Sequence, residues 1–406
     1  MLEYLNEIVC GNCLEVIGRM PDNCIDSIIT DPPYGLKFMN KQWDYNIPEK
    51  DIWIEALRVA KPGAFLLCFG GTRTYHRLAC EIEDAGWELR DCIMWIYGSG
   101  FPKSLNIGKA IDKSLGVKQI IVGKEKGMGK QNPEWNGTAQ GRAENCFKPE
   151  YDKTVATSEQ AQLFDGYGTA LKPAYEPIIV AMKPLDGTFA NNALTHGVAG
   201  LNIDGGRIEY SVVDGGNLAK NPQLRKKING GCGGNIISHE EKRRIVIPNQ
   251  KGRFPANVIM DEEAGRLLDE QSGVLKSGEI NPDKHIHKHK TGSSLSGSKD
   301  GSLNTYQGSR HYESDTGGAS RFFYCAKASK SDRGEGNNHP TVKPITLMEY
   351  LCKLTRTPTG GVVLDPFCGS GTTAIAAALT NRHCVCIDIS EEYCKIARQR
   401  LASNRG

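Results

Sequence analysis

The sequence predicts an α/β fold with a mostly parallel β-sheet, built from the two ends of the chain around a long inserted middle. Short apolar stretches alternate with amphipathic stretches over residues 1–100. The same alternation returns over residues 336–406, and neither end alone supplies a full sheet. The middle differs, because it is rich in Gly, Asn, Ser and Lys and shows little periodicity.

Apolar stretches in the N-terminal part predict four strands. These are Glu7–Cys10, Ile25–Thr30, Ala64–Phe69 and Asp91–Tyr97. Helical spacing predicts two helices, Ile52–Ala60 and Thr72–Ala85. We expect Thr72 to be the N-cap and Gly86 the C-cap of the second helix.

The C-terminal part repeats this alternation of strand and helix. In chain order we expect the strand Val362–Asp365, the helix Thr372–Leu379, the strand Cys384–Asp388 and the helix Glu391–Leu401. In the middle, Tyr175–Met182 predicts a buried strand that pairs with Asp91–Tyr97. The stretch from Lys276 to Ser320 is typical of a flexible loop.

Composition excludes several classes of protein. The chain has 406 residues, enough for two domains or one large domain with insertions. With 39% hydrophobic and 24% charged residues, it is not a disordered protein. No apolar run approaches the roughly 18 residues of a membrane span, and Glu3 and Glu7 stand where a secretory signal would be basic. We therefore expect a cytoplasmic protein without a membrane partner, whose 14 cysteines are reduced thiols.

Positive charge is concentrated in the middle of the chain. Residues 101–330 hold 32 Lys and Arg against 25 Asp and Glu, a net +7, whereas the remainder carries a net −4. This asymmetry indicates a nucleic-acid partner. The candidate phosphate contacts lie in three basic clusters, Arg225, Lys226 and Lys227; Lys242, Arg243 and Arg244; and the Lys284–Lys290 segment with Lys288. The alternative is that these clusters are merely solvated.

A glycine-rich segment follows the expected strand Val362–Asp365 and opens a helix. It runs DPFCGSGTT from Asp365 to Thr373, with glycines at 369 and 371. Glycines let the backbone approach a ligand, and a helix N-terminus favours an anionic group such as a carboxylate. The spacing matches neither a dinucleotide fingerprint nor a P-loop.

An acid ends the next expected strand. Asp388 stands about 20 residues after the glycine segment, the separation at which an acid can accept hydrogen bonds from ribose hydroxyls. Together the two features predict a nucleoside ligand with an anionic or zwitterionic tail, which S-adenosyl-L-methionine fits. The alternative is a glycine-rich turn with an unrelated acid.

A second motif, Asp31-Pro32-Pro33-Tyr34, follows the strand IDSIIT. It would stand at the carboxyl edge of the sheet, where open α/β sheets bind ligands. The prolines fix the backbone and leave carbonyl groups available, and the tyrosine ring can stack on a planar base.

These motifs, in this order, resemble those of the DNA amino-methyltransferases, which methylate adenine N6 or cytosine N4. The resemblance is carried by DPPYG at 31–35, HPTVKP at 339–344, DPFCGSGTT at 365–373 and Tyr393-x-x-x-Ala397-x-x-Arg400. A catalytic motif that precedes the cofactor loop is typical of the permuted beta class. In the middle, FPKS, LKPAYEPIIVAMKP, RFPANVI and RFFYCAKAS resemble phage and prophage members.

The resemblance implies a Rossmann-like, seven-stranded class I SAM-dependent methyltransferase sheet with an inserted target-recognition region. It implies that Asp91–Tyr97 and Tyr175–Met182 form the antiparallel edge of that sheet. The expected divisions are 1–100 for the catalytic half, 101–170 for an insertion, 171–185 for an edge strand, 186–335 for target recognition and 336–406 for the SAM-binding half.

The implied activity is methyl transfer from S-adenosyl-L-methionine to adenine N6 of a base flipped out of double-stranded DNA. The catalytic residues would be Asp31, Pro32, Pro33 and Tyr34. Asp31 and the Pro32 carbonyl would accept the amine N–H groups while Tyr34 stacks on the base, without a covalent intermediate.

The same resemblance implies a set of cofactor-binding residues. These are Asn12, Lys343, Asp365, Phe367, Gly369, Gly371, Thr372 and Asp388. Asn12 is a departure, because relatives usually have Asp there, although an amide oxygen can still accept a hydrogen bond. No metal is expected, and a homodimer and a cognate restriction enzyme are left open.

Several alternatives remain at this point. Cytosine N4 presents the same chemistry, but that class more often has Ser where Asp31 stands, so we favour adenine. Methylation of RNA or of a protein glutamine, and a catalytically silent DNA-binding protein, are further alternatives. Cys10 and Cys13 have zinc-like spacing but no second pair, and His285, His287 and His289 lie in a basic loop. We favour free thiols and phosphate contacts over metal sites.

Overall fold

The computed structural model describes residues 4–36, 44–100, 104–126, 150–209, 252–276, 316–327, 330–334 and 336–404. The chain forms two compact units. The larger unit combines Met1–Gly98 with Tyr175–Gly406, and the smaller unit is Ser99–Ala174.

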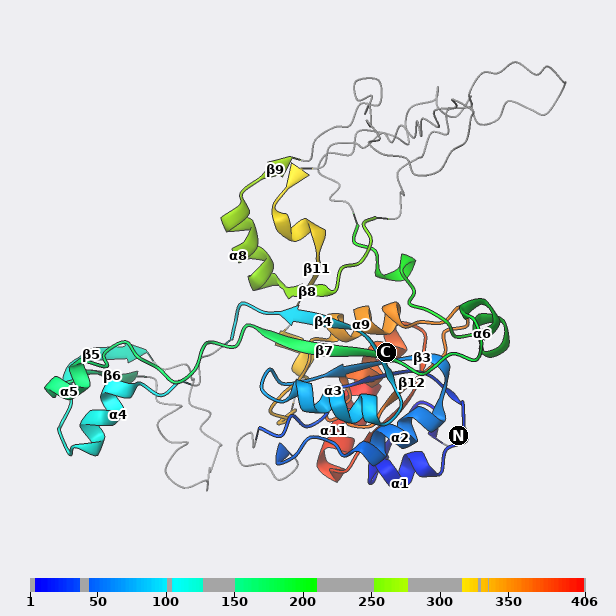
Figure 1. Cartoon of the computed structure of the whole chain (residues 1–406), viewed down its shortest axis with the longest axis horizontal. Coiled ribbons are helices and arrows are strands. Elements are labelled where there is room, and N and C mark those ends of the chain that lie inside the picture. Colours follow the sequence, from blue (N-terminus) through cyan, green and yellow to red (C-terminus); the bar gives the residue numbers. More distant parts are fainter. Residues whose placement is uncertain are drawn as a thin grey trace, which may run out of the picture. The chain divides into compact units, whose positions relative to one another are not determined.

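The larger unit is built on a nine-stranded sheet with the order β1-β13-β12-β2-β3-β7-β4-β8-β11 (Figure 1). Its strands are β1 (Glu7–Cys10), β2 (Ile25–Thr30), β3 (Ala60–Phe69), β4 (Glu88–Ile96), β7 (Tyr175–Met182), β8 (Val258–Asp261), β11 (Tyr324–Ala326), β12 (Val362–Asp365) and β13 (His383–Asp388). Only β7 runs antiparallel to its neighbours among these strands. The pairs β1–β13 and β12–β2 join the two ends of the chain in one sheet, which confirms the predicted mostly parallel α/β fold.

Helices cover both faces of this sheet. One face packs against α1 (Cys13–Gly18), α2 (Lys50–Val59) and α3 (Tyr75–Asp84), and the other against α9 (Ile345–Leu354), α10 (Thr372–Leu379) and α11 (Glu391–Ser403). Neighbouring strand residues point to opposite faces. Leu66 therefore lies in the core on the side of α1, α2 and α3, and Leu67 in the core on the side of α9, α10 and α11. All six residues of β2 are buried because the strand is covered on both sides.

The sheet continues beyond the edge that the resemblance implies. The pairing of β4 with β7 is confirmed, but β8 pairs with β4 and β11 pairs with β8, both in parallel. The expected edge is therefore interior. The middle of the chain supplies two short strands, of which β8 satisfies backbone groups of β4, and Ile259 and Met260 of β8 are buried there.

The start of α3 also differs from the prediction. Thr74, and not Thr72, is the N-cap, because Thr74 and Tyr75 donate their backbone N–H groups to the Gly71 carbonyl in a turn before the helix. The C-cap is Ala85, and Gly86 follows it with φ +102°.

The remaining elements of the larger unit lie in the inserted part of the sequence. They are α6 (Phe189–His196), η4 (Asp204–Gly206), α8 (Glu262–Ser272), β9 (Leu275–Lys276), β10 (Thr316–Gly317), η7 (Ala319–Phe322) and η8 (Lys330–Arg333). The antiparallel pair of β9 and β10 joins the two ends of the stretch expected to be a flexible loop. Residues 277–315 of that stretch lie outside the described residues.

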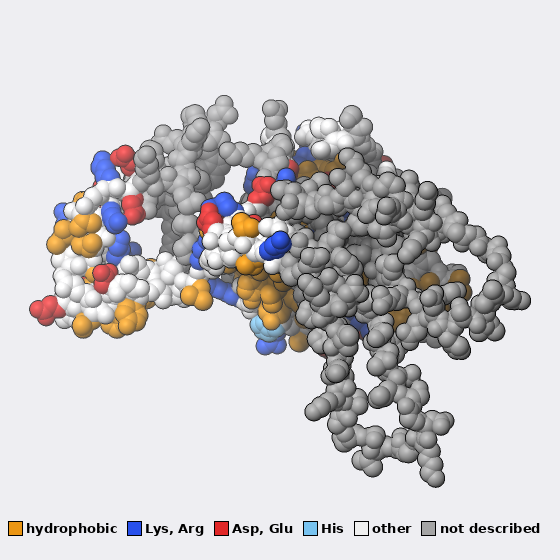
Figure 2. Space-filling view, turned by 90° about the horizontal axis from the view of Figure 1, so that it is seen from above, with side chains coloured by type: hydrophobic (Ala, Val, Ile, Leu, Met, Phe, Trp, Pro, Cys, Tyr) orange, Lys and Arg blue, Asp and Glu red, His pale blue; other side chains and the backbone are white. Residues whose placement is uncertain are grey.

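The smaller unit contains α4 (Ile107–Ser114), β5 (Ile120–Lys126), β6 (Glu150–Val155) and α5 (Glu159–Gln162). The strands form an antiparallel ribbon, and the Asp112 carboxylate accepts hydrogen bonds from the Ser158 hydroxyl at 2.7 Å and the Thr157 N–H at 2.8 Å. Figure 2 shows hydrophobic, basic and acidic side chains interspersed on the surface of this unit. Across the described parts of both units, no helix is long and apolar enough to cross a membrane.

Candidate functional site

The carboxyl ends of the parallel strands meet at one edge of the sheet, and chemically active side chains follow several of them. Asp31 comes directly after β2, whereas Asp365 and Asp388 end β12 and β13. Asn12 stands two residues after β1. Because β7 is antiparallel, its first residues lie at this same edge and add Glu176. Residues far apart in the sequence are thereby brought to one site.

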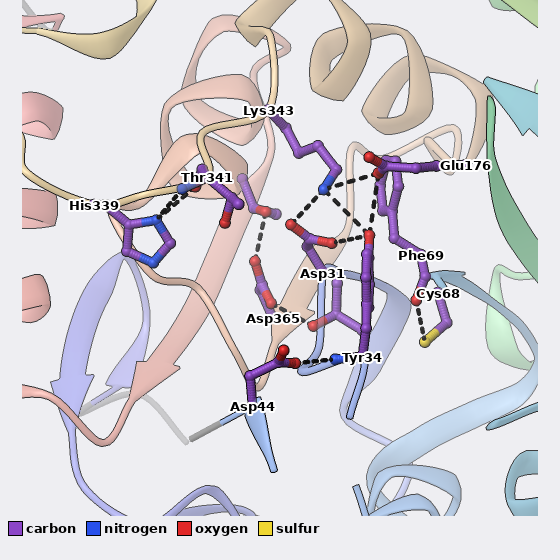
Figure 3. Close-up of polar contacts among 12 residues, drawn as sticks. Asp31, Tyr34, Asp44, Cys68, Phe69, Glu176, His339, Thr341, Lys343 and Asp365 are labelled. Atoms are coloured by element: carbon purple, nitrogen blue, oxygen red, sulfur yellow. Dashed lines mark hydrogen bonds and ion pairs between the residues drawn. The ribbon is translucent and has the colours of Figure 1, made fainter. Parts of the chain in front are cut away.

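The Asp31 carboxylate lies in a cluster of four side chains (Figure 3). Its Oδ2 atom is 2.5 Å from Lys343 Nζ, and its Oδ1 atom accepts the Tyr34 hydroxyl at 2.7 Å. The Tyr34 hydroxyl is also 3.1 Å from Glu176 Oε2 and 3.3 Å from Lys343 Nζ. Lys343 Nζ completes the cluster with an ion pair to Glu176 at 3.2 Å. We call Asp31, Tyr34, Glu176 and Lys343 the Asp31 cluster.

Burial and charge fix the protonation states of this cluster. Burial disfavours the Lys343 ammonium, but the charges of Asp31 and Glu176 outweigh it and raise the pKa of Lys343 to about 12. Burial, together with the same two carboxylates, raises the pKa of Tyr34 well above its usual value. Lys343 is therefore a cation and Tyr34 a neutral hydroxyl at neutral pH.

The Lys343 side chain is directed toward the Asp31 cluster. Its Nζ atom lies 4.8 Å from the centre of the Phe69 ring and 5.6 Å from that of the Tyr34 ring, within range of cation–π attraction. The sequence prediction grouped Lys343 with the cofactor-binding residues. In the structure its ammonium contacts Asp31 and Glu176.

The loop that carries Tyr34 is held by a buried carboxylate that the sequence analysis missed. Asp44 is 3% exposed and accepts backbone N–H bonds from Tyr34 at 2.7 Å, Gly35 at 3.0 Å and Leu36 at 3.2 Å. A carboxylate that accepts several N–H bonds fixes a loop firmly. Pro32 is buried beside this loop, and Pro33 is half-buried.

The glycine segment between β12 and α10 takes a conformation that requires glycine. Gly369 has φ +50°, and a Cβ atom there would lie 2.9 Å from the His339 ring. Gly371 has φ +81°, and a Cβ atom there would lie 2.7 Å from Ala397. Gly371 is the N-cap of α10, and no side chain of the described residues caps this helix, whose first residue is Thr372.

The Asp365 carboxylate makes its hydrogen bonds within the protein. Its Oδ1 atom accepts the Thr30 hydroxyl at 2.6 Å and the Phe367 N–H at 3.1 Å, and its Oδ2 atom accepts the Thr373 hydroxyl at 2.5 Å. Burial raises the pKa of Asp365 to about 6, although these hydrogen bonds oppose the shift. Phe367 packs its ring 6.4 Å from that of Trp53. These contacts tie β2, β12 and α10 together beneath the glycine segment.

Asp388 contacts the glycine segment directly. Its Oδ2 atom accepts the Gly369 N–H at 2.8 Å and its Oδ1 atom the Ser390 N–H at 2.8 Å. Burial raises the pKa of Asp388. The next residue, Ile389, is 69% exposed, an apolar surface beside the acid that the sequence analysis overlooked. Asn12 is exposed at this edge, and its side chain accepts the Leu14 N–H at 2.9 Å as the N-cap of α1.

One face of α11 supports the glycine segment. Tyr393 meets the His339 ring edge-on with ring centres 4.4 Å apart, and Ala397 lies against Gly371. Arg400 donates to the Ser370 carbonyl at 2.5 Å and to the Thr372 hydroxyl at 3.3 Å. The spacing Tyr393-x-x-x-Ala397-x-x-Arg400 places all three on one side of the helix. These three residues of α11 therefore pack against the glycine segment and support it.

The remaining sequence candidates cannot be compared with this geometry. Arg225, Lys226, Lys227, Lys242, Arg243, Arg244, Lys288 and the three histidines 285, 287 and 289 lie outside the described residues. Cys10 and Cys13 are described and are free thiols. Within the described ranges, no three His, Cys, Asp or Glu side chains are grouped so that they could hold a metal ion.

Comparison with known proteins identifies the family. Residues 25–399 match the N6_N4_Mtase family, described as DNA methylase. The protein belongs to this family of DNA methylases. The match runs from β2 into α11 and includes Asp31, the glycine segment and Asp388, whereas Asn12 and Arg400 lie just outside it.

Individual relatives match over shorter stretches. The type II methyltransferase M2.DpnII of Streptococcus pneumoniae is 49% identical over 63 residues, 16% of this chain and 23% of that protein. M2.LlaDCHI of Lactococcus lactis is 35% identical over 105 residues, 24% of this chain and 38% of that protein. The DNA adenine methyltransferase YhdJ of Escherichia coli is 42% identical over 67 residues, 16% of this chain and 22% of that protein. The matches thus span well under half the length of these relatives.

Two solved structures match over most of the chain, but only with low scores. The complex of M1.HpyAVI with SAM has a TM-score of 0.38 and 15% identity, covering 97% of this chain and 99% of that chain. The cytosine-N4-specific PvuII DNA methyltransferase has a TM-score of 0.40 and 11% identity, covering 99% of this chain and 93% of that chain. Scores this low establish neither fold nor function on their own.

Proposed function

We propose that this protein transfers a methyl group from S-adenosyl-L-methionine to the N6 amino group of adenine in double-stranded DNA. The observation that carries the proposal is the position of Asp31 at the end of β2, at the same sheet edge as the glycine segment. The family described as DNA methylase supports the reaction class.

Asp31 and Pro32 would act on the target amine. The exocyclic amine of adenine is conjugated with its ring and is a poor nucleophile. If the Asp31 carboxylate and the Pro32 carbonyl accept its two N–H bonds, the nitrogen lone pair turns toward the methyl donor. Pro33 fixes the backbone of this turn, and Tyr34 offers its ring for stacking on the flipped base.

The glycine segment and Asp388 fit the cofactor. Gly369 and Gly371 have positive φ angles and no room for a Cβ atom beside His339 and Ala397, so this tight turn between β12 and α10 depends on glycine. The N-terminus of α10 suits the carboxylate of the methionine part, and Asp388 suits ribose hydroxyls. Ile389 would add an apolar contact for the adenine ring, and Asn12 a hydrogen-bond acceptor. When bound, S-adenosyl-L-methionine supplies an activated methyl group on a sulfonium sulfur.

Two features favour adenine over cytosine N4. Asp31 stands where the cytosine class more often has Ser, and one matching relative, YhdJ, is named as a DNA adenine methyltransferase. Target recognition is proposed for residues 186–335, and the basic clusters of the middle would contact phosphates. A homodimer and a cognate restriction enzyme stay predictions of the resemblance, the latter supported by relatives named as type II methyltransferases.

Transfer of a labelled methyl group tests the proposal. The protein is incubated with methyl-labelled S-adenosyl-L-methionine and, in parallel, with duplex DNA, single-stranded RNA and a glutamine-containing protein fraction. We expect label in the duplex DNA alone. Label only in RNA or protein would overturn the substrate class, and cofactor binding without any transfer would support the catalytically silent alternative.

A further inference from the structure

Glu176 is a carboxylate of the Asp31 cluster to which the proposed reaction assigns no task. It is the second residue of β7, and the six residues after it are buried. Its Oε2 atom lies 3.1 Å from the Tyr34 hydroxyl and 3.2 Å from Lys343 Nζ. Its side chain is 23% exposed and that of Asp31 is 24% exposed, so both carboxylates reach the surface of the cluster.

A continuous hydrogen-bond path leads from Asp31 to Glu176. The first step joins Asp31 Oδ1 to the Tyr34 hydroxyl at 2.7 Å, and the second joins that hydroxyl to Glu176 Oε2 at 3.1 Å. A hydroxyl can accept one proton while it donates another. The Tyr34 hydroxyl is therefore placed to relay a proton between the two carboxylates.

The charges around Glu176 leave one negative charge in excess. The charged or titratable groups that face it are Asp31, Tyr34 and Lys343, together with Tyr97, which directly follows β4. Burial and Glu176 raise the pKa of Tyr97 to about 12, so both tyrosines are neutral at pH 7. One ammonium thus faces two carboxylates. This surplus equals the single positive charge that passes from sulfur to nitrogen when a sulfonium methyl is transferred.

We propose that Glu176 is the final acceptor of the proton that the target amine loses, with the Tyr34 hydroxyl as the relay from Asp31. The inference rests on the proposed function. The amine lone pair forms the new N–C bond, the S–C bond breaks, and its electron pair stays on sulfur. One N–H bond then breaks with its electron pair left on nitrogen, and the proton passes to Asp31. Asp31 gives a proton to Tyr34 as Tyr34 gives its own to Glu176, which releases it to water.

Lys343 holds this path in place without taking part in it. An ammonium has three donors and no acceptor, so it cannot take the proton. It lies 2.5 Å from Asp31 and 3.2 Å from Glu176, and so it keeps both carboxylates beside the Tyr34 hydroxyl. Glu176 is thus a positioning and proton-accepting residue that acts through Tyr34.

The first test is Glu176→Gln, which keeps the shape of the side chain but removes its basic carboxylate. General-base contributions are about 10²–10⁴-fold, so we expect the single-turnover rate at saturating cofactor and duplex to fall by about 100-fold. The cofactor dissociation constant and the signal of a fluorescent base analogue at the target should not change. The matched control is Glu88→Gln, which removes a carboxylate near the opposite end of the paired strands β4 and β7 and should keep the wild-type rate.

A second measurement separates proton transfer from a structural role. Formate added to Glu176→Ala should raise its transfer rate, because the small acid can occupy the emptied space and accept the proton, whereas chloride should not. Combining Glu176→Gln with Tyr34→Phe should be no slower than the slower single variant, since both interrupt one path.

Three outcomes would overturn the inference. They are a wild-type rate in Glu176→Gln, a reduced rate explained by lost base capture or cofactor affinity, and additive losses in the double variant. These results would leave the proposed function intact. By contrast, wild-type protein that transfers no methyl group to DNA would overturn the proposed function, and the inference with it.

Discussion

The Asp31 cluster and the glycine segment are held in place by different kinds of interaction. In the Asp31 cluster, side-chain charges dominate, with Lys343 placed between Asp31 and Glu176. In the glycine segment, backbone groups dominate, since Gly369 donates its N–H to Asp388 and Gly371 donates its N–H to the Cys368 carbonyl. A side chain can change its hydrogen-bond partner while the backbone stays in place, whereas a backbone N–H group can change its partner only if the backbone moves.

This difference matches the two tasks proposed for the site. Asp31 can release Lys343 to accept the target amine while it keeps the Tyr34 hydroxyl, and Lys343 then keeps its contact with Glu176. The cofactor instead needs a fixed cradle. Changes in the Asp31 cluster should therefore alter the rate of transfer, and changes in the glycine segment should alter cofactor affinity.

The largest expected effect is that of Asp31→Ala. We expect methyl transfer to be abolished, because the amine loses its charged acceptor, while Lys343 retains its ion pair with Glu176. Cofactor affinity should stay within a few fold of wild type, since the proposed contacts of Asp31 are with the target amine. Transfer is measured with labelled cofactor, and affinity by calorimetry. Near-normal turnover would remove Asp31 from the catalytic role.

Gly369→Val should abolish cofactor binding. The branched side chain would combine an unfavourable positive φ with a Cβ atom 2.9 Å from the His339 ring. Gly197→Val is the matched control, because Gly197 also has a positive φ, +70°, but nothing lies within 4 Å of its Cβ position. Equilibrium titration with the cofactor compares the two variants. Retained binding in Gly369→Val would mean that the cofactor lies elsewhere.

The pH dependence of stability should report on Asp365, which lies beneath the glycine segment. Asp365 is buried without a partner cation among the described residues, and its pKa is raised to about 6 from 3.8. The folded protein thus binds more protons than the unfolded chain between these values, so its stability falls as the pH rises through this window. The loss should reach about 3 kcal/mol at about 1.36 kcal/mol per pKa unit. Denaturant unfolding of wild type and Asp365→Asn at pH 4 and pH 7 measures it, and equal pH dependence in both would contradict the assignment.

Asp388→Ala should have a smaller effect on binding. Loss of hydrogen bonds to a charged acceptor costs about 1.5–3 kcal/mol, which raises the cofactor dissociation constant by roughly tenfold or more. The variant also leaves the N–H groups of Gly369 and Ser390 without their acceptor, so its unfolding temperature should fall as well. Calorimetry and a thermal scan report both, and unchanged affinity would place the ribose away from Asp388.

The smallest effects are expected in the basic clusters of the middle. Replacing Arg225, Lys226 and Lys227 by Ala should lower the slope of log K against log salt by up to about 0.9 per lost phosphate contact. The effect should be similar for cognate and unrelated duplexes, and cofactor binding should not change. Salt titrations of this variant and of the Lys242–Arg244 variant test the prediction. Unaltered slopes in both would indicate solvated clusters.

The sequence predicted the parts of the fold whose signals are local. The bounds of α10 and β12 agree with expectation because a glycine segment separates an apolar strand from an Ala-rich helix. The strands β8 and β11 were missed because apolar runs of three or four residues carry little periodicity.

The composition of the Asp31 cluster could not be predicted, because its members are distant in sequence. Lys343 lies 312 positions from Asp31, and only the sheet topology brings them together. Glu176 carried one weak signal, a lone charge in the otherwise apolar strand YEPIIVAM. Asp44 carried none, since nothing local shows that it accepts N–H bonds from the Tyr34 loop.

The most direct test of the account is the identity of the methylated base. Duplex DNA is incubated with the protein and S-adenosyl-L-methionine and then digested to nucleosides, which are separated and identified by mass spectrometry. The Asp31→Ala variant is treated in the same way. The account predicts N6-methyladenine with the wild-type protein and none with the variant. N4-methylcytosine in place of N6-methyladenine, or N6-methyladenine at equal levels with both proteins, would contradict it.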